Sequence, residues 1–172
     1  MIKALAKYAC AVGAVIAIVM TNYSADLRTG QRGLELIGNA EGCYTKPYQC
    51  PADVLTVGIG TTDAVEKIDR KKVYTIEEIA ALFTKGVKQA EDCVNRYASG
   101  ANMPQGAFDA LTSITFNVGC GKLQNSTLFR MARQGYTPKM CDQFSRWVYS
   151  GGKILPGLVE RRSKERALCL TF

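Results

Sequence analysis

One ten-residue stretch of the sequence, EGCYTKPYQC, combines a carboxylate with two cysteines. Glu41 opens the stretch, and Cys43 and Cys50 follow it. A carboxylic acid placed beside a reacting group can donate a proton to it. The two cysteines can form a disulfide only if the chain turns back between them, because a disulfide holds its Cα atoms about 5.5 Å apart. The stretch therefore contains a candidate catalytic acid and a candidate disulfide side by side.

The composition limits the chemistry that the chain can perform. The 172 residues include seven cysteines and no histidine. The absence of histidine excludes Ser-His-Asp and Cys-His catalysis and the usual histidine-containing zinc sites. No two cysteines have the C-x-x-C spacing of many metal sites, and we expect no bound metal. We also expect no other cofactor. The number of cysteines in a chain of this length indicates an oxidising compartment. Because seven is odd, at least one thiol is free, shared or intermolecular.

The formal net charge of +7 favours an anionic partner, such as a nucleic acid, a membrane surface or an acidic wall polymer. A merely soluble basic surface would have the same charge. The lysine and arginine residues are dispersed along the sequence, except for the two clusters RKK and ERRSKER. No nucleic-acid-binding motif is present. We therefore expect no nucleic-acid partner.

The amino-terminal residues have the layout of an export signal. Lys3 and Lys7 precede an uncharged run over residues 8–20, and no A-x-A cleavage pattern follows. We expect the segment to stay attached; the alternative is a cleaved signal peptide that carries Cys10 away. A helix over this run covers about 20 Å, whereas the hydrocarbon core is about 30 Å thick. One lysine drawn into the membrane would cost about 2.5–3.5 kcal/mol, so insertion is near balance and the segment could later leave.

The rest of the chain predicts a mainly helical protein with one small β element. A helix over residues 29–39 ends at the glycine-rich GNAEG and leaves Glu41 at its exit. VLTVGIGTT, residues 54–62, predicts a hairpin of short strands with Thr56 on the first strand. TIEE at residues 75–78 is a capping box that begins a long amphipathic helix. Further helices are expected from Pro104 towards NVGCG, over residues 126–135 with Gly135 as the stop, from Pro138 through residue 148, and over residues 156–170.

The spacing of Glu41, Cys50 and Thr56 resembles the pattern of the phage-type lysozymes, glycoside hydrolase family 24. That pattern is a Glu, an Asp nine residues later and a Thr six residues further, just before a GIG turn, and VGIGTT stands at that place here. FDALTSITFNVGCGKLQNSTLFR and LPGLVERRSKERALCL are similar to later segments of the family, so the resemblance covers about residues 29–172.

The sequence departs from most members of this family at Cys50, where they have Asp. A subset of the signal-anchor-release endolysins has a cysteine there, together with one in the anchor and one two residues after the Glu. Cys10 and Cys43 match these two positions.

The resemblance implies an α+β fold, mainly α, in which a small β-hairpin lobe and a helical lobe are joined by a long helix. Residues 1–26 would be the signal-anchor-release segment and residues 27–172 the catalytic domain. It implies a monomeric phage enzyme, exported by the host machinery and held in the host inner membrane by residues 8–20, facing the periplasm. After release it would be soluble in the periplasm, where it would cleave the β-1,4 bond between N-acetylmuramic acid and N-acetylglucosamine in peptidoglycan.

Within this resemblance Glu41 is the proton donor, which requires an apolar, desolvated pocket that keeps the acid protonated. Cys50 would position a water as a thiol or act as a base as a thiolate, and Thr56 would hold the same water. Asp53 is a rival for the second carboxylate role, but we expect a solvated turn residue there. Without the resemblance, Glu41 would be interpreted as a surface carboxylate at a helix end.

A Cys43–Cys50 disulfide would remove the thiol of Cys50 and hold the enzyme inactive. Once the anchor leaves the membrane, a Cys10 thiolate could attack Cys43, form Cys10–Cys43 and expel Cys50 as the free thiol. The alternative is a plain structural bridge, with Cys10 idle. Four cysteines remain for structural disulfides, which we expect to join Cys93 to Cys169 and Cys120 to Cys141.

Two other functions fit the same residues. A lytic transglycosylase can work with one essential Glu, and a membrane-tethered wall-binding protein needs no catalysis. The stereochemical outcome of hydrolysis stays open, because it normally follows from the separation of two carboxylates and one is missing here.

Overall fold

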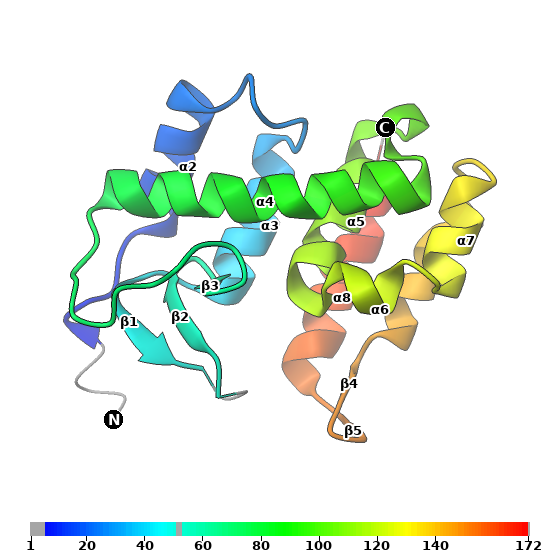
Figure 1. Ribbon diagram of the computed structural model, residues 1–172. Helices are drawn as coiled ribbons and strands as arrows, with labels where there is room; N and C mark the ends of the chain where they lie inside the picture. Colours follow the sequence, from blue (N-terminus) through cyan, green and yellow to red (C-terminus); the bar gives the residue numbers. More distant parts are fainter. Residues whose placement is uncertain (1–5, 51–52, 172) are drawn as a thin grey trace.

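The computed structural model describes residues 6–50 and 53–171, so Lys3 of the export signal lies outside the described residues (Figure 1). The helices and strands, in chain order, are α2 (Val12–Asn22), α3 (Gln31–Glu41), β1 (Tyr44–Gln49), β2 (Leu55–Gly58), β3 (Thr61–Thr62), α4 (Ile76–Ala98), the 3₁₀-helix η1 (Gly100–Asn102), α5 (Gln105–Val118), α6 (Cys120–Leu123), α7 (Thr127–Arg133), the 3₁₀-helix η2 (Pro138–Arg146), β4 (Tyr149–Ser150), β5 (Lys153–Ile154) and α8 (Pro156–Cys169).

The molecule has two lobes, and α4 runs through both of them (Figure 1). One hydrophobic core is formed by α2, α3, β2 and the first half of α4, including Phe83 and Val87. The other is formed by the end of α4, including Val94, with α5 to α8. The two-lobed, mainly helical fold that we expected is therefore confirmed, and α3, which carries Glu41, lies between the two cores.

The long helix begins at the predicted capping box. The backbone N–H of Glu78 donates to the hydroxyl of Thr75 at 3.2 Å, and the Glu78 carboxylate accepts from the backbone N–H of Thr75 at 3.0 Å. These two bonds satisfy donors that the first turn of a helix otherwise leaves free. The helix then buries one face along its whole length, as the three- and four-residue spacing of its apolar residues predicts.

The predicted hairpin is present as β2 and β3, and β1 extends it into a three-stranded antiparallel sheet. Thr56 on β2 lies opposite Tyr48 on β1 and Thr62 on β3. Since directly opposed residues of antiparallel strands project from the same face, these three side chains form one row across the sheet.

Most of the segment predicted to enter the membrane, residues 8–20, lies in α2, which packs against α3 and α4. Val15, Ile16 and Val19 are buried there. Gly38 of α3 permits the close approach, because a Cβ at that position would lie 2.6 Å from a methyl carbon of Val12. Among the helices of residues 6–50 and 53–171, none has the length and apolar character needed to cross a membrane.

The helical lobe differs in two details from the expectation. The segment from Pro138 forms a 3₁₀-helix rather than an α-helix, although Met140 and Phe144 are buried as the pattern predicts. A short hairpin, β4–β5, precedes α8 and was not predicted from the sequence.

Candidate active site

Glu41 is the last residue of α3, at the junction between the two lobes. The helix ends there because Gly42 has φ +73°, a conformation that glycine adopts without steric cost, and its N–H donates to the carbonyl of Gly38. The side chain of Glu41 is 22% exposed, so it is accessible from solvent but not free in it.

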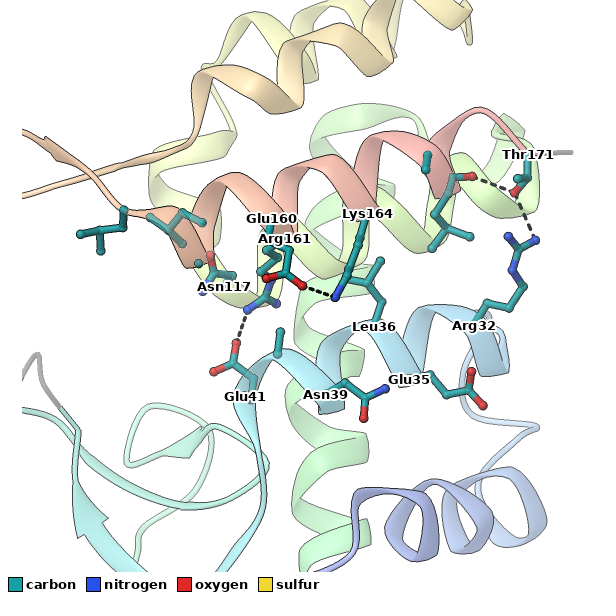
Figure 2. A pocket seen from close by; sticks show the side chains of 16 residues that line it. Arg32, Glu35, Leu36, Asn39, Glu41, Asn117, Glu160, Arg161, Lys164 and Thr171 are labelled. Atoms are coloured by element: carbon teal, nitrogen blue, oxygen red, sulfur yellow. Dashed lines mark hydrogen bonds and ion pairs between the residues drawn. The ribbon is translucent and has the colours of Figure 1, made fainter. Parts of the chain in front are cut away.

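Arg161 of α8 faces Glu41. Its Nη1 donates to Glu41 Oε1 at 2.6 Å, and Figure 2 shows this contact at the head of the pocket. The expectation of apolar surroundings for Glu41 was therefore wrong, because a guanidinium lies in direct contact with the carboxylate. We had interpreted Arg161 only as part of a basic cluster. The signal that could have identified it is its four-residue spacing to Glu165, which pairs a cation and an anion on one helix face.

The GIG turn between β2 and β3 lies against Glu41 from the other side. A Cβ at Gly60 would be 3.3 Å from both Cγ and Oε2 of Glu41 and 3.0 Å from the ring of Phe116. Gly60 also has φ +67°, which disfavours any side chain. Glycine at this position thus allows the turn to approach the carboxylate closely.

Cys50 follows directly after β1 and is a free, partly exposed cysteine. Its backbone N–H donates to the carbonyl of Val54 and its carbonyl accepts from Asp53 N–H, at 3.0 and 2.9 Å, which closes a tight turn. Asp53 is exposed, with φ +60°, and accepts from the amide of Gln49 at 2.9 Å. As expected, Asp53 is a solvated turn residue.

Thr56 is 4% exposed, and its hydroxyl donates to the carbonyl of Val54 at 3.1 Å. A hydroxyl that donates one hydrogen bond can still accept others. The geometry is therefore compatible with a water bound at its oxygen.

Tyr48 links these candidate residues and was missed in the sequence. It lies opposite Thr56 and packs edge-on against Tyr44, with ring centroids 5.1 Å apart. Burial raises the pKa of Tyr48, and the nearby acidic groups of Glu41, Tyr44 and Cys50 raise it further. The side chain of Tyr48 thus lies within electrostatic range of both Glu41 and Cys50.

The disulfides are Cys10–Cys43, Cys93–Cys120 and Cys141–Cys169. Cys43 is thus bonded to Cys10 while Cys50 is free, which is the arrangement expected after exchange rather than before it. The amino-terminal segment is held to β1 by backbone bonds as well, from Cys10 N–H to the Cys43 carbonyl at 3.0 Å and from Thr45 N–H to the Tyr8 carbonyl at 2.8 Å.

Our pairing of the four later cysteines was wrong. We expected Cys93 with Cys169 and Cys120 with Cys141. The physical reason for the observed pairing is the packing of neighbouring elements: α5 packs along α4 and its end brings Cys120 to Cys93, while η2 packs along α8 and brings Cys141 to Cys169.

A groove of about 1030 Å³ extends from Glu41 between α3 and α8 (Figure 2). Its lining combines apolar side chains, including Leu36 and Leu158, with charges of both signs, including Arg32 and Glu35 from α3 and Lys164 from α8. Such a lining offers hydrogen-bonding and charged groups as well as apolar surface to a bound molecule.

Comparison with known proteins decides the family. The model of the family described as phage lysozyme matches residues 38–165. The chain belongs to the phage lysozyme family. It is also 44% identical to the SAR-endolysin of Escherichia phage P1 over 173 residues, which covers 94% of this chain and 91% of that protein. This phage lysozyme is therefore a glycoside hydrolase of the muramidase type, and the wall-binding alternative without catalysis is set aside.

Two solved structures of a relative differ in their similarity to this lysozyme. The active form of P1 phage endolysin Lyz matches with a TM-score of 0.87 at 41% identity, covering 95% of each chain. The secreted inactive form of P1 phage endolysin Lyz matches with a TM-score of 0.58 at 40% identity, covering 83% of this chain and 95% of that chain.

Proposed function

We propose that this phage lysozyme is an endolysin that cleaves the β-1,4 bond between N-acetylmuramic acid and N-acetylglucosamine in peptidoglycan during host cell lysis. Glu41 donates the proton to the leaving oxygen, and Cys50 and Thr56 position the attacking water. The observation that carries the proposal is the place of Glu41, which lies at one end of the groove between α3 and α8, with Arg161 on one side of its carboxylate and the Gly60 turn on the other.

Glu41→Gln tests this assignment. The amide keeps the size of the side chain but supplies no acid proton, so we expect the rate of peptidoglycan cleavage to fall by at least about 100-fold. The assay measures new ends released from purified peptidoglycan, with circular dichroism as the check that the variant folds. If a folded Glu41→Gln protein kept more than a tenth of the parental cleavage rate, Glu41 would not be the proton donor.

Product analysis separates hydrolysis from the transglycosylase alternative. A hydrolase adds water and leaves reducing ends, whereas a lytic transglycosylase leaves 1,6-anhydro ends. Mass spectrometry of the released fragments distinguishes the two because they differ by one water. If 1,6-anhydro ends were the main product, the enzyme would be a lytic transglycosylase and not a hydrolase.

We further propose that the enzyme is controlled by thiol–disulfide exchange. Residues 1–26 export the chain and hold it in the host inner membrane through residues 8–20, with a Cys43–Cys50 disulfide that removes the Cys50 thiol. Release into the periplasm lets the Cys10 thiolate attack Cys43, so that Cys10–Cys43 forms, Cys43–Cys50 breaks and Cys50 leaves as a thiolate. Support comes from the Cys10–Cys43 bond with free Cys50, and from the greater similarity to the active form of the P1 endolysin.

Cys10→Ser should leave the released enzyme inactive until a reductant is added, because no thiol is then available to expel Cys50. The measurement is muralytic activity of the released protein with and without dithiothreitol. Full activity of Cys10→Ser without reductant would rule out the exchange.

A further inference from the structure

A buried carboxylate, Glu165, lies directly behind the ion pair between Arg161 and Glu41. It is one turn further along α8 and has no exposed surface. Its Oε1 accepts from Arg161 Nε at 3.2 Å and from the hydroxyl of Ser113 at 2.7 Å, and its Oε2 accepts from Arg162 Nη1 at 2.5 Å. Because it is fully buried, it cannot touch a bound polysaccharide and can act only through its neighbours.

The guanidinium of Arg161 is divided among three acceptors. Nε donates to Glu165, Nη2 donates to the backbone carbonyl of Ser113 at 3.3 Å, and Nη1 donates to Glu41. A guanidinium is planar and its donors point in fixed directions. The two contacts at the back of the plane therefore set the direction in which the third donor points at Glu41.

The charges in this cluster are also shared. Arg161 and Arg162 are 7% and 1% exposed, so each needs a nearby counter-charge. Glu165 contacts both of them, and Arg162 also donates to the side-chain oxygen of Asn117. Burial raises the pKa of Glu165, whereas the two arginines act in the opposite direction. With Glu165 in place, Glu41 offsets only part of the positive charge of Arg161.

We propose that Glu165 is a positioning residue for catalysis: it holds Arg161 so that Glu41 receives a single directed N–H, and it balances the charge of Arg161 so that Glu41 can still hold a proton. Without Glu165, the fork of Arg161 is free to turn onto Glu41 and bind it with two parallel hydrogen bonds, which stabilise the carboxylate form. The inference rests on the proposed role of Glu41 as the proton donor.

A purely structural role makes a different prediction. Ser113 and Asn117 belong to α5, so the same contacts also fasten α8 to α5 and their loss should lower stability. A structural role would not change the pH dependence of the enzyme that remains folded. The variants below leave the other charged or titratable groups of this region in place, on α3, on α8, on β1 and directly after β1; they are Tyr48, Cys50, Glu35, Glu160, Arg162 and Lys164.

Glu165→Gln in the full chain, in its Cys10–Cys43 form, tests the proposal. We expect the alkaline limb of the kcat–pH profile on purified peptidoglycan to move to lower pH by about one unit. At neutral pH kcat should fall about tenfold, while KM should change by less than about twofold because Glu165 does not contact substrate. Glu91→Gln is the control with matched burial, because Glu91 is a 1% exposed carboxylate on α4 that accepts from Thr29.

Glu165→Asp keeps the charge but withdraws the carboxylate by one methylene. It should keep the alkaline limb of the parent and lose part of kcat, and it serves as the test if the Gln variant does not fold. The proposal is overturned if folded Glu165→Gln has the pH profile of Glu91→Gln, or if Glu165→Asp has the full kcat of the parent. Glu41→Gln is assayed in parallel: an active Glu41→Gln protein refutes the proposed function itself, whereas an inactive one with a parental Glu165→Gln profile refutes only the positioning role.

Discussion

At the scale of single residues, the site depends on two close approaches to one carboxylate. Arg161 contacts one oxygen of Glu41, and Gly60 leaves just enough space beside the other. The two neighbours act differently: Arg161 forms an ion pair with Glu41, whereas Gly60 lacks a side chain that would clash with it. Either can be changed without touching Glu41 itself.

Gly60→Ala should lower the rate of peptidoglycan cleavage by the folded protein. The added methyl would lie 3.3 Å from Oε2 of Glu41 and would push the carboxylate or the turn aside. A side chain at φ +67° also costs about 1 kcal/mol in stability. Gly151→Ala is the matched control, since Gly151 has φ +56° but a Cβ there meets nothing within 4 Å.

Both variants are compared by urea denaturation and by peptidoglycan cleavage. The comparison separates the backbone strain of a side chain at positive φ from the contact of the added methyl group with Glu41. Gly60→Ala should lose more unfolding free energy than Gly151→Ala, because its Cβ would also lie 3.0 Å from the ring of Phe116. A fall in kcat of about tenfold or more is expected in the folded Gly60→Ala protein alone. Equal activity of the two variants would show that the approach of Gly60 to Glu41 does not matter for catalysis.

The sequence indicated part of this site and not the rest, for a physical reason. Glu41, Cys50 and Thr56 lie within sixteen consecutive residues, so their spacing and the GIG turn were visible in the sequence. Arg161 lies 120 positions from Glu41, and the contact exists only because α8 folds beside α3. Spacing along the chain carries no information about that packing, and the apolar surroundings that we expected for Glu41 were therefore wrong.

At the scale of elements, the start of α3 is fixed by two buried carboxylates. Glu91 accepts from the backbone N–H and the hydroxyl of Thr29 at 2.6 and 2.7 Å. Asp109 accepts from the N–H of Gly30 at 3.0 Å and from the amide of Gln105 at 2.7 Å. Negative groups at the first turn of a helix satisfy free N–H donors and the helix dipole. This attachment fastens the amino-terminal end of α3 to α4, which carries Glu91, and to α5, which carries Asp109.

Asp109 should make stability depend on pH. Burial raises the pKa of Asp109 from 3.8 to about 6, against the hydrogen bonds from Gly30 and Gln105. A carboxylate whose pKa is raised by folding contributes stability that is fully present below the unfolded value and is lost as the pH rises through the folded value. The loss from this group between about pH 4 and pH 6 should reach up to about 3 kcal/mol.

Asp109→Asn isolates this contribution, because the amide stays neutral and keeps an oxygen acceptor for Gly30. The unfolding free energy of the parent minus that of the variant should decrease from about pH 4 to pH 7, as measured by urea denaturation. Asp92→Asn, which removes an exposed carboxylate on α4, is the control. A difference for Asp109→Asn that stays constant over that range would contradict the prediction.

Signals within single elements were also the ones that predicted well. The capping box at Thr75, the hairpin over residues 54–62 and the helix exit at Glu41 each depend on neighbouring residues, and each is confirmed. The pairing of Cys93 with Cys120 depends on which helices lie side by side, which no local pattern contains. The segment from Pro138 packs against α8, and its 3₁₀ geometry was not visible in the local spacing of its apolar residues.

At the scale of the whole molecule, the amino-terminal segment is part of the folded enzyme. The helix α2 contributes Val15, Ile16 and Val19 to the core of the sheet lobe. Residues 8–10 lie along the edge of β1, next to the disulfide that joins Cys10 to Cys43. The same segment, in our proposal, lies in the membrane before release. One stretch of weakly apolar sequence would then serve first as an anchor and afterwards as core.

The most direct test of this account is a disulfide map of the membrane-bound and the released protein. Free thiols are trapped by alkylation, and cross-linked peptides are identified by mass spectrometry without reduction. We expect Cys43–Cys50 in the membrane fraction, and Cys10–Cys43 with an alkylated Cys50 in the released fraction. Cys93–Cys120 and Cys141–Cys169 should be the same in both and serve as internal controls. Cys43 bonded to the same partner in both fractions would contradict the exchange of disulfides.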